Sequence, residues 1–251
     1  MAIVKVNGVN LHVQRIGKGP TVVMLHGAFS TLTDWYFTVA PILASHHECI
    51  MYDLRGHGRS ERVTSGFDLE TLMNDLLDLL NELRLEKVPM LGHSFGALVT
   101  MRLALAHPER VSHLVVIEAP LPPTQAGWIG AFTSKTPSEM LEVLPTIAQQ
   151  FIRKGGRKAR ELLKSIAFLA RETSLISDIE AEADFTDEDL ARIRCPTLCI
   201  YGADSSCLDA GQRLGSKIHG ARLEIMPGGH YLHWEHAARL GARISRFLQS
   251  P

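Results

Sequence analysis

The chain has 251 residues, with 26 Lys and Arg against 27 Asp and Glu and 45% hydrophobic residues. A chain of this length buries most of its unfolded surface, so we expect one sizeable core. The near-zero charge balance lacks the basic footprint of proteins that bind nucleic acid or an anionic membrane surface. We therefore expect neither a nucleic-acid partner nor a membrane partner, and a small molecule as substrate.

The N-terminal segment alternates apolar and polar residues around Asn7-Gly8, which predicts a β-hairpin. It lacks the charged-then-apolar order of a signal peptide, and nowhere does the chain contain an apolar run of about 18 residues that would span a bilayer. The cysteines are too few and too unevenly spaced for a disulfide framework. We expect reduced thiols in a cytoplasmic protein; the residues are Cys49, Cys195, Cys199 and Cys207.

Short apolar runs then alternate with helical periods. The predicted strands are residues 21–25, 49–52, 88–91 and 113–117, and the predicted helices between and after them are residues 34–44, 68–83 and 95–106. Buried runs that alternate with helices are typical of βαβ units. The sequence therefore predicts an α/β fold with a mostly parallel sheet that carries helices on both faces.

This alternation stops at Ala119-Pro120-Leu121-Pro122-Pro123, a cluster that can continue neither a strand nor a helix. Only helical stretches follow, near residues 137–153 and 159–171. An insertion placed after a strand covers the carboxyl ends of the sheet, where ligands of open α/β sheets bind. We therefore predict a helical lid over residues 121–189.

Strand and helix patterns return after the predicted lid. They are a strand at 197–201, a helix from residue 208, a strand at 222–226 and a final helix that ends at residue 248. The predicted organisation is thus an α/β core of residues 1–120 and 190–251 that is interrupted by the lid.

The segment Gly92-His93-Ser94-Phe95-Gly96 lies between a predicted strand and a predicted helix. A sharp strand-to-helix turn strains its central residue, and Gly92 and Gly96 leave room for that turn. The turn presents the hydroxyl of Ser94 at a helix N-terminus, where backbone amides stabilise negative charge. We predict that Ser94 is a nucleophile; the alternative is a glycine-rich helix start with an incidental serine.

A serine nucleophile needs a general base and a group that orients the base. Gly228-Gly229-His230 follows the last predicted strand, and the two glycines allow the loop to fold back over the sheet, so His230 is the candidate base. His233 and His236 continue the spacing, but no cysteine or carboxylate set accompanies them. We therefore expect no metal site among these histidines.

Three carboxylates are candidates for the acid that orients His230. Asp204 lies just past the predicted strand 197–201 and is the first candidate. Asp209 lies five residues further along, and Glu118 follows the predicted strand 113–117, so both stay open as alternatives.

Five segments in the same order resemble the α/β-hydrolase fold family. They are LHGAFS (25–30), DLRGHGRS (53–60), GHSFGA (92–97), RIRCPTLCIYGAD (192–204) and PGGHYLHWEH (227–236). The order of nucleophile, acid and histidine also matches this family. The resemblance implies an oxyanion hole made by the backbone amides of Ala28 and Phe95, a loop shaped by His26 and Gly27, and a structural turn at 53–60 near the site.

The chain departs from the family pattern at the acid. The family usually places its acid three residues after the glycine that ends the strand, and this chain has Ser205 there, whereas Asp204 lies two residues after that glycine.

Subfamilies of this fold differ at the nucleophile, here Ser94, and in the residues after the first His-Gly pair, here His26-Gly27. Ser94 argues against epoxide hydrolases, haloalkane dehalogenases and dienelactone hydrolases, which carry Asp or Cys there. Carbon–carbon bond hydrolases usually carry Gly-Pro-Gly where this chain has Ala28-Phe29-Ser30. The resemblance implies hydrolysis of an ester, thioester or lactone of a small apolar acyl group through an acyl-enzyme on Ser94, with no cofactor. A carbon–carbon bond hydrolase and a non-catalytic ligand-binding protein or receptor remain alternatives.

Two further features concern the substrate. The candidate substrate-binding residues are His26, Trp35, Trp128 and Phe132, and an apolar lid suits an acyl chain or an aromatic acid. In addition, residues 153–171 are strongly basic, and residues 178–189 are strongly acidic. These are either complementary solvated helix faces or a basic patch that docks a coenzyme A, phosphopantetheine or acyl-carrier partner.

Overall fold

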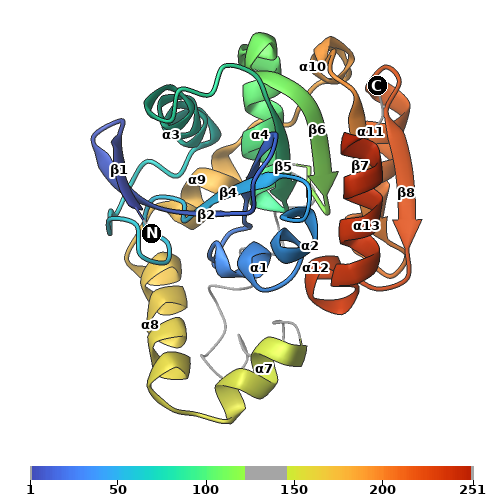
Figure 1. The fold of residues 1–251 in the computed structure, drawn as a ribbon. Coiled ribbons are helices and arrows are strands. Elements are labelled where there is room, and N and C mark those ends of the chain that lie inside the picture. The colour runs from blue at the N-terminus through green and yellow to red at the C-terminus, as the bar shows by residue number, and fades with distance from the viewer. Residues whose placement is uncertain (1, 122–145, 250–251) are drawn as a thin grey trace.

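The computed structural model describes residues 2–121 and 146–249 (Figure 1). Its strands form one sheet in the order β1-β2-β4-β3-β5-β6-β7-β8. β1 and β2 pair in an antiparallel manner, as do β2 and β4, and the other neighbours are parallel. The bounds are β1 Ala2–Val6, β2 Val9–Ile16, β3 Thr21–Leu25, β4 Glu48–Tyr52, β5 Val88–His93, β6 Val111–Ile117, β7 Thr197–Gly202 and β8 Arg222–Met226.

The predicted N-terminal hairpin is confirmed. Val6 faces Val9 across the turn, and both turn residues adopt positive φ, 41° at Asn7 and 80° at Gly8. Asparagine and glycine tolerate this conformation better than other residues, which is why the pair specifies a two-residue hairpin.

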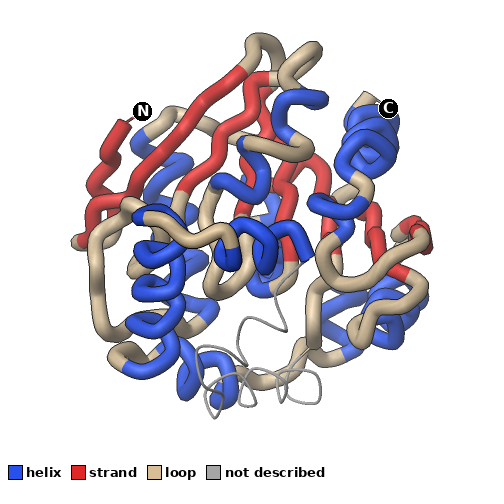
Figure 2. The backbone as a smooth tube through the Cα atoms, turned by 90° about the horizontal axis from the view of Figure 1, so that it is seen from below, coloured by secondary structure: helices blue, strands red, loops and turns tan. Residues whose placement is uncertain are grey.

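Helices cover both faces of the sheet (Figure 2). Because side chains alternate along a strand, Val23 and Leu25 pack with one set of helices, and Val22 and Met24 pack with the other. The first set includes α3 (Leu69–Glu82), α4 (Phe95–Ala106) and α11 (Leu208–Lys217), and the second contains α1 (Thr33–Tyr36), α2 (Ala40–Leu43), α12 (Leu232–Glu235) and α13 (Ala237–Leu248). This confirms the predicted α/β fold.

The predicted helix over residues 34–44 is wrong in one respect, because the segment forms two short helices, α1 and α2. Pro41 lies in the first turn of α2. Proline has no N–H to donate and its ring clashes with the preceding turn, so an unbroken helix through this position is disfavoured. A turn at residues 37–39 therefore separates α1 from α2.

The described part of the predicted lid is helical. It contains α7 (Thr146–Arg153), α8 (Arg157–Arg171), α9 (Leu175–Ala181) and α10 (Asp187–Arg192). Ile166, Leu169 and Leu175 belong to the same apolar cluster as the sheet residues Leu25 and Tyr52. The helices α8 and α9 are thus packed into the core, although a role as a lid stays a prediction. Trp128 and Phe132 lie outside the described residues.

None of the helices within residues 2–121 and 146–249 is both long and apolar enough to cross a membrane. The four cysteines are free, and Cys49, Cys199 and Cys207 are buried.

Candidate active site

Ser94 lies in a strained turn between β5 and α4, with φ 52° and ψ −122°. A side chain at Gly92 would overlap the backbone of Ala97, and one at Gly96 would overlap the carbonyl of His26. The backbone amide of Ser94 donates to the carbonyl of Ile117 at the end of β6, over 2.8 Å. The local sequence therefore does what the motif predicts, because the two glycines permit a turn that a larger residue would open.

His230 is brought to Ser94 by the loop between β8 and α12. Its Nε2 lies 3.0 Å from Oγ of Ser94, and its Nδ1 lies 3.3 Å from Oε2 of Glu118. A carboxylate only accepts hydrogen bonds, so Nδ1 carries the ring proton and Nε2 is left to accept the proton of the serine hydroxyl. This arrangement has the geometry of a nucleophile, a base and an orienting acid.

The carboxylate at His230 is that of Glu118 and not that of Asp204, the first candidate from the sequence. Asp204 and Asp209 are both exposed, and the amide of Asp204 donates to the carbonyl of Gly228 over 3.0 Å. Glu118 is fully buried at the end of β6 and has a positive φ of 54°. A non-glycine residue held in this conformation stores strain, which is typical of functional sites.

Gly202 at the end of β7 explains how Glu118 reaches His230 from two strands away. β7 lies between β6 and β8 in the sheet, so the Glu118 side chain must pass over the end of β7. Gly202 has no side chain there, and its amide donates to Oε1 of Glu118. Ser205, at the position where the family usually has its acid, donates its hydroxyl to Oε2 of Glu118.

Opposing influences act on the pKa of His230. Burial by itself lowers this pKa, but the hydrogen bonds to Cys207 and Glu118 and the charge of the Glu118 carboxylate outweigh burial and raise it to about 9. The carboxylate stabilises the imidazolium, the form that the predicted base would take on removing the serine proton.

This shift predicts the pH dependence of catalysis. As the predicted general base, His230 acts in its neutral form. The value of kcat/KM, measured with a chelator to remove bound metal ions, should therefore rise about tenfold per pH unit below the pKa and level off near pH 9. In Glu118→Gln, the residual activity should level off at a lower pH, because one group that raises the pKa is lost. A wild-type profile that levels off near the unperturbed value of about 6.5 would contradict this prediction.

The loop after β3 runs beside Ser94, as expected for an oxyanion loop. A Cβ at Gly27 would lie 3.1 Å from Cβ of Ser94. The Phe95 amide belongs to the first turn of α4, so it has no acceptor within that helix. Ala28 follows Gly27 directly, and its amide together with that of Phe95 remains the predicted oxyanion hole.

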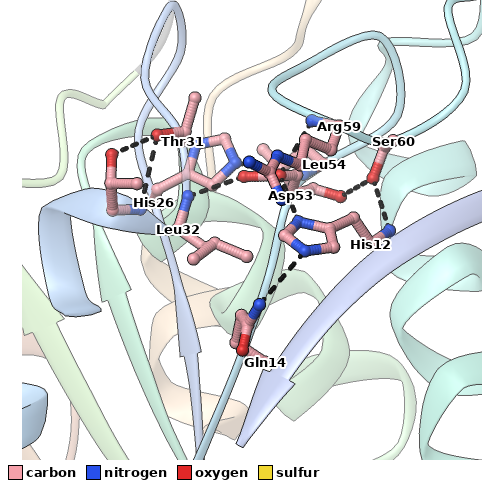
Figure 3. Close-up of polar contacts among 10 residues, drawn as sticks. His12, Gln14, His26, Thr31, Leu32, Asp53, Leu54, Arg59 and Ser60 are labelled. Atoms are coloured by element: carbon pink, nitrogen blue, oxygen red, sulfur yellow. Dashed lines mark hydrogen bonds and ion pairs between the residues drawn. The ribbon is translucent and has the colours of Figure 1, made fainter. Parts of the chain in front are cut away.

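His26 and Trp35, two of the predicted substrate contacts, are fully buried and do not line the site. The His26 ring donates from Nδ1 to the carbonyl of Gly27 over 2.7 Å. Its Nε2 accepts from the amide of Leu54 over 3.0 Å (Figure 3). Burial lowers the pKa of His26, which is consistent with this neutral ring. His26 thus shapes the loop, and Trp35 packs in the core beneath the site.

Asp53, the residue directly after β4, braces the loop that follows β3 (Figure 3). Its Oδ1 accepts from the amide of Leu32 over 2.8 Å, and its Oδ2 accepts from His12 over 2.8 Å and from the amide of Arg59 over 2.9 Å. The Ser60 hydroxyl donates to the carbonyl of Asp53. The turn at residues 53–60 is therefore a structural support that connects the loop after β3 to β2 and β4.

Asp53→Asn is expected to lower the free energy of unfolding by about 3 kcal/mol, measured by chemical denaturation. The new amide can still accept from Leu32, but its NH₂ group would face two donors, His12 and the amide of Arg59. The matched control Asp209→Asn removes an exposed carboxylate and should change stability by less than about 1 kcal/mol. Equal effects of the two variants would contradict the bracing role.

Two residues near the site, Cys207 and His93, were not predicted from the sequence to have a role. Cys207 places Sγ 3.7 Å from Nδ1 of His230, and it reaches this position from the turn before α11. His93 donates from Nε2 to the backbone carbonyl of His230 over 2.9 Å and so holds the loop that carries the base. Burial lowers the pKa of His93 well below its ordinary value, which keeps this ring neutral.

Comparison with known proteins gives the family. Residues 20–163 match the family described as alpha/beta hydrolase fold. A 2-hydroxy-6-oxononadienedioate/2-hydroxy-6-oxononatrienedioate hydrolase of Pseudomonas putida is 30% identical, over 95% of this chain and 91% of that protein. The enol-lactonase from Burkholderia xenovorans LB400 has a TM-score of 0.82 at 22% identity, over 99% of this chain and 100% of that one. A solved N-acyl homoserine lactone degrading enzyme has a TM-score of 0.77 at 24% identity, over 98% and 100% of the chains.

Together with the strained serine turn, the sheet order and the Ser94–His230–Glu118 contacts, these matches show that the chain belongs to the α/β hydrolase fold family.

Proposed function

We propose that the protein is a serine hydrolase that cleaves an ester, thioester or lactone of a small, largely apolar acyl group. Two contacts carry this proposal. Oγ of Ser94 lies 3.0 Å from Nε2 of His230, and Nδ1 of His230 lies 3.3 Å from Oε2 of Glu118. Glu118 is the acid of this proposed triad, and its burial favours a persistent contact with the imidazole.

The proposed reaction is acyl transfer in two steps. His230 Nε2 takes the hydroxyl proton as Ser94 Oγ forms a bond to the carbonyl carbon, and the oxyanion is held by the amides of Ala28 and Phe95. The leaving alkoxide or thiolate takes the proton from His230 as its bond to the carbonyl carbon breaks. Water, deprotonated by His230, then attacks the acyl-enzyme, and Ser94 recovers its proton.

The loop after β3 supports ester or lactone chemistry over carbon–carbon bond cleavage. Phe29 occupies a position with a positive φ of 61° and is buried, so a bulky side chain fills the segment where carbon–carbon bond hydrolases usually have Gly-Pro-Gly. The relative in Pseudomonas putida is nevertheless named for a dienedioate substrate, so carbon–carbon bond hydrolysis is the alternative for this site.

A fluorophosphonate probe and a substrate panel test the proposal. The probe should form one covalent adduct, on Ser94, and the panel should show turnover of p-nitrophenyl esters or of lactones. Higher kcat/KM for a 2-hydroxy-6-oxo dienoate than for any ester or lactone would favour the carbon–carbon alternative. The absence of an adduct on Ser94 would favour a ligand-binding protein on the same fold.

A basic surface on α7 and α8 favours thioesters as one substrate class. Arg153, Lys154, Arg157, Arg160 and Lys164 are all exposed. Among the ion pairs of the described residues, these side chains make only the pair of Lys164 with Glu161, at 3.3 Å. A surface with this charge suits the phosphates of coenzyme A or of a phosphopantetheine group.

The acidic stretch at residues 178–189 does not neutralise that surface, because several of its carboxylates bind groups of the core. Asp178 accepts from the amide of Phe67, and Glu182 accepts from the amide of Leu69. Asp184 and Asp187 both pair with Arg213 of α11. These contacts support the docking alternative over complementary helix faces within the lid.

Salt dependence of KM separates the two interpretations. For a coenzyme A thioester, KM should rise with ionic strength, and Arg160→Gln/Lys164→Gln should raise it about fivefold at low salt. The charge-matched control Arg84→Gln/Lys87→Gln removes exposed basic residues elsewhere and should leave KM unchanged. The same salt dependence for a neutral p-nitrophenyl ester would exclude docking.

A further inference from the structure

On the Nδ1 side of its ring, His230 contacts a thiol as well as the carboxylate. Sγ of Cys207 lies 3.7 Å from Nδ1, and Oε2 of Glu118 lies 3.3 Å from the same atom. The three atoms all lie within 4.8 Å of one another, and the Cys207 and Glu118 side chains are buried. A sulfur, a nitrogen and an oxygen donor thus converge on the position of one ring proton.

Two of the three separations between these donors match those of a tetrahedral metal site. Zinc bonds of about 2.3 Å to sulfur and about 2.1 Å to nitrogen and oxygen, at tetrahedral angles, place sulfur and nitrogen about 3.6 Å apart and nitrogen and oxygen about 3.4 Å apart. The structure has 3.7 Å and 3.3 Å. The third separation, between Sγ of Cys207 and Oε2 of Glu118, is at most 4.8 Å, so the three side chains can close around an ion that replaces the Nδ1 proton.

We propose that Glu118, Cys207 and His230 bind a thiophilic divalent cation of the Zn²⁺ or Cd²⁺ type, and that this ion inhibits the enzyme. The thiolate selects such ions over Mg²⁺ and Ca²⁺, which prefer oxygen ligands. The sequence could not predict this set, because the three residues follow β6, precede α11 and follow β8. His233 and His236, which raised the question of a metal in the sequence, are not part of it.

Inhibition follows from the proton balance at His230. The ion bonds to the Nδ1 lone pair, the thiol of Cys207 releases its proton to solvent, and the ring proton moves from Nδ1 to Nε2. With Nε2 protonated, His230 no longer accepts the proton of Ser94, and Glu118 is occupied by the ion. The inhibition rests on the proposed function, whereas binding of the ion does not.

A second group of donors near the site provides a competing location. Asp34, His93 and His233 also bring ligand atoms within 4.8 Å of one another. This group has no thiol, the ligand that Zn²⁺ and Cd²⁺ favour. In addition, Nε2 of His93 already donates to the carbonyl of His230, which is not part of the group, over 2.9 Å. The two locations are distinguished by their dependence on Cys207.

Titration of the metal-free full chain with Cd²⁺ tests binding without reference to catalysis. Wild type should develop the ultraviolet charge-transfer absorption of a cadmium thiolate with one ion per chain, and Cys207→Ser should not. Cys195→Ser, a control at a half-buried thiol outside both groups, should behave as wild type. Absorption that persists in Cys207→Ser would overturn the proposal.

Inhibition is tested with Zn²⁺ on ester turnover, each variant being compared with its own metal-free activity. The concentration for half inhibition should rise on the order of 100-fold in Cys207→Ser and stay unchanged in His233→Gln, with Mg²⁺ having no effect. The opposite result would place the ion at Asp34, His93 and His233 and overturn the proposal. Cadmium absorption in a protein that turns over no ester, thioester or lactone would leave the metal site standing and contradict the proposed function. Binding without inhibition would contradict the inhibitory role.

Discussion

Ser94→Ala is expected to lower kcat for a p-nitrophenyl ester by about 10⁵-fold or more, because it removes the atom that forms the acyl-enzyme. KM should change little, since the hydroxyl contributes little to ground-state binding. The fold should persist, because Oγ of Ser94 contacts His230 and alanine fits the same turn. Initial rates and a thermal unfolding curve on the same preparation check both statements.

Ser45→Ala is the matched control for this prediction. Ser45 is exposed after α2, and its hydroxyl donates only to the local carbonyl of Ile42 among the described contacts. Its turnover should equal that of wild type. Turnover by Ser94→Ala within about tenfold of wild type would show that the reaction does not pass through an acyl-enzyme on Ser94.

Glu118→Gln is expected to lower kcat by about 10³-fold to 10⁴-fold, whereas Asp204→Asn should stay within about twofold of wild type. The new amide can keep its oxygen on the amide of Gly202, which places its NH₂ group toward Nδ1 of His230. Two donors would then face each other, and the ring is driven to the tautomer with the proton on Nε2. That tautomer cannot take the proton of Ser94.

Moving the carboxylate back to the usual family position makes this prediction sharper. Ser205 Oγ contacts Oε2 of Glu118, so Ser205→Asp brings a carboxylate close to Nδ1 of His230. In the Glu118→Gln background, adding Ser205→Asp should raise kcat at least about tenfold above that of Glu118→Gln alone, and adding Ser205→Asn should not raise it. A large loss in Asp204→Asn with little loss in Glu118→Gln would show that Asp204 is the acid in solution.

The features that the sequence determined depend on neighbours along the chain. The elbow at Ser94 is specified by Gly92 and Gly96, and the hairpin by Asn7 and Gly8, because backbone conformation at such turns is decided by the residues themselves. His230 follows from two glycines after a strand. Apolar strand segments that alternate with helical periods likewise predict a parallel sheet before it is known which strands pair.

Other features were decided by contacts across the sheet. Glu118 and Asp204 both follow strands that end at the same edge, and the sequence does not show which side chain reaches His230. Gly202 decides it, because its missing side chain leaves room for Glu118 to cross the end of β7 and its backbone amide donates to Oε1 of Glu118. Asp204 is instead exposed to solvent. The buried position of His26 likewise could not be predicted from the sequence, because it depends on a contact with Leu54 in the loop after β4.

The position of the Cys207 thiol could not be predicted from the sequence either. Its spacing from Glu118 and His230 along the chain carries no signal, and only the arrangement β6-β7-β8 brings the three together. Local propensity and periodicity therefore predicted the α/β sheet, the motifs supplied the resemblance to the family, and local sequence nominated two residues of the proposed triad, Ser94 and His230. Tertiary packing decided the acid, the buried role of His26 and the donor cluster, because these depend on distances of a few ångströms between residues far apart in sequence.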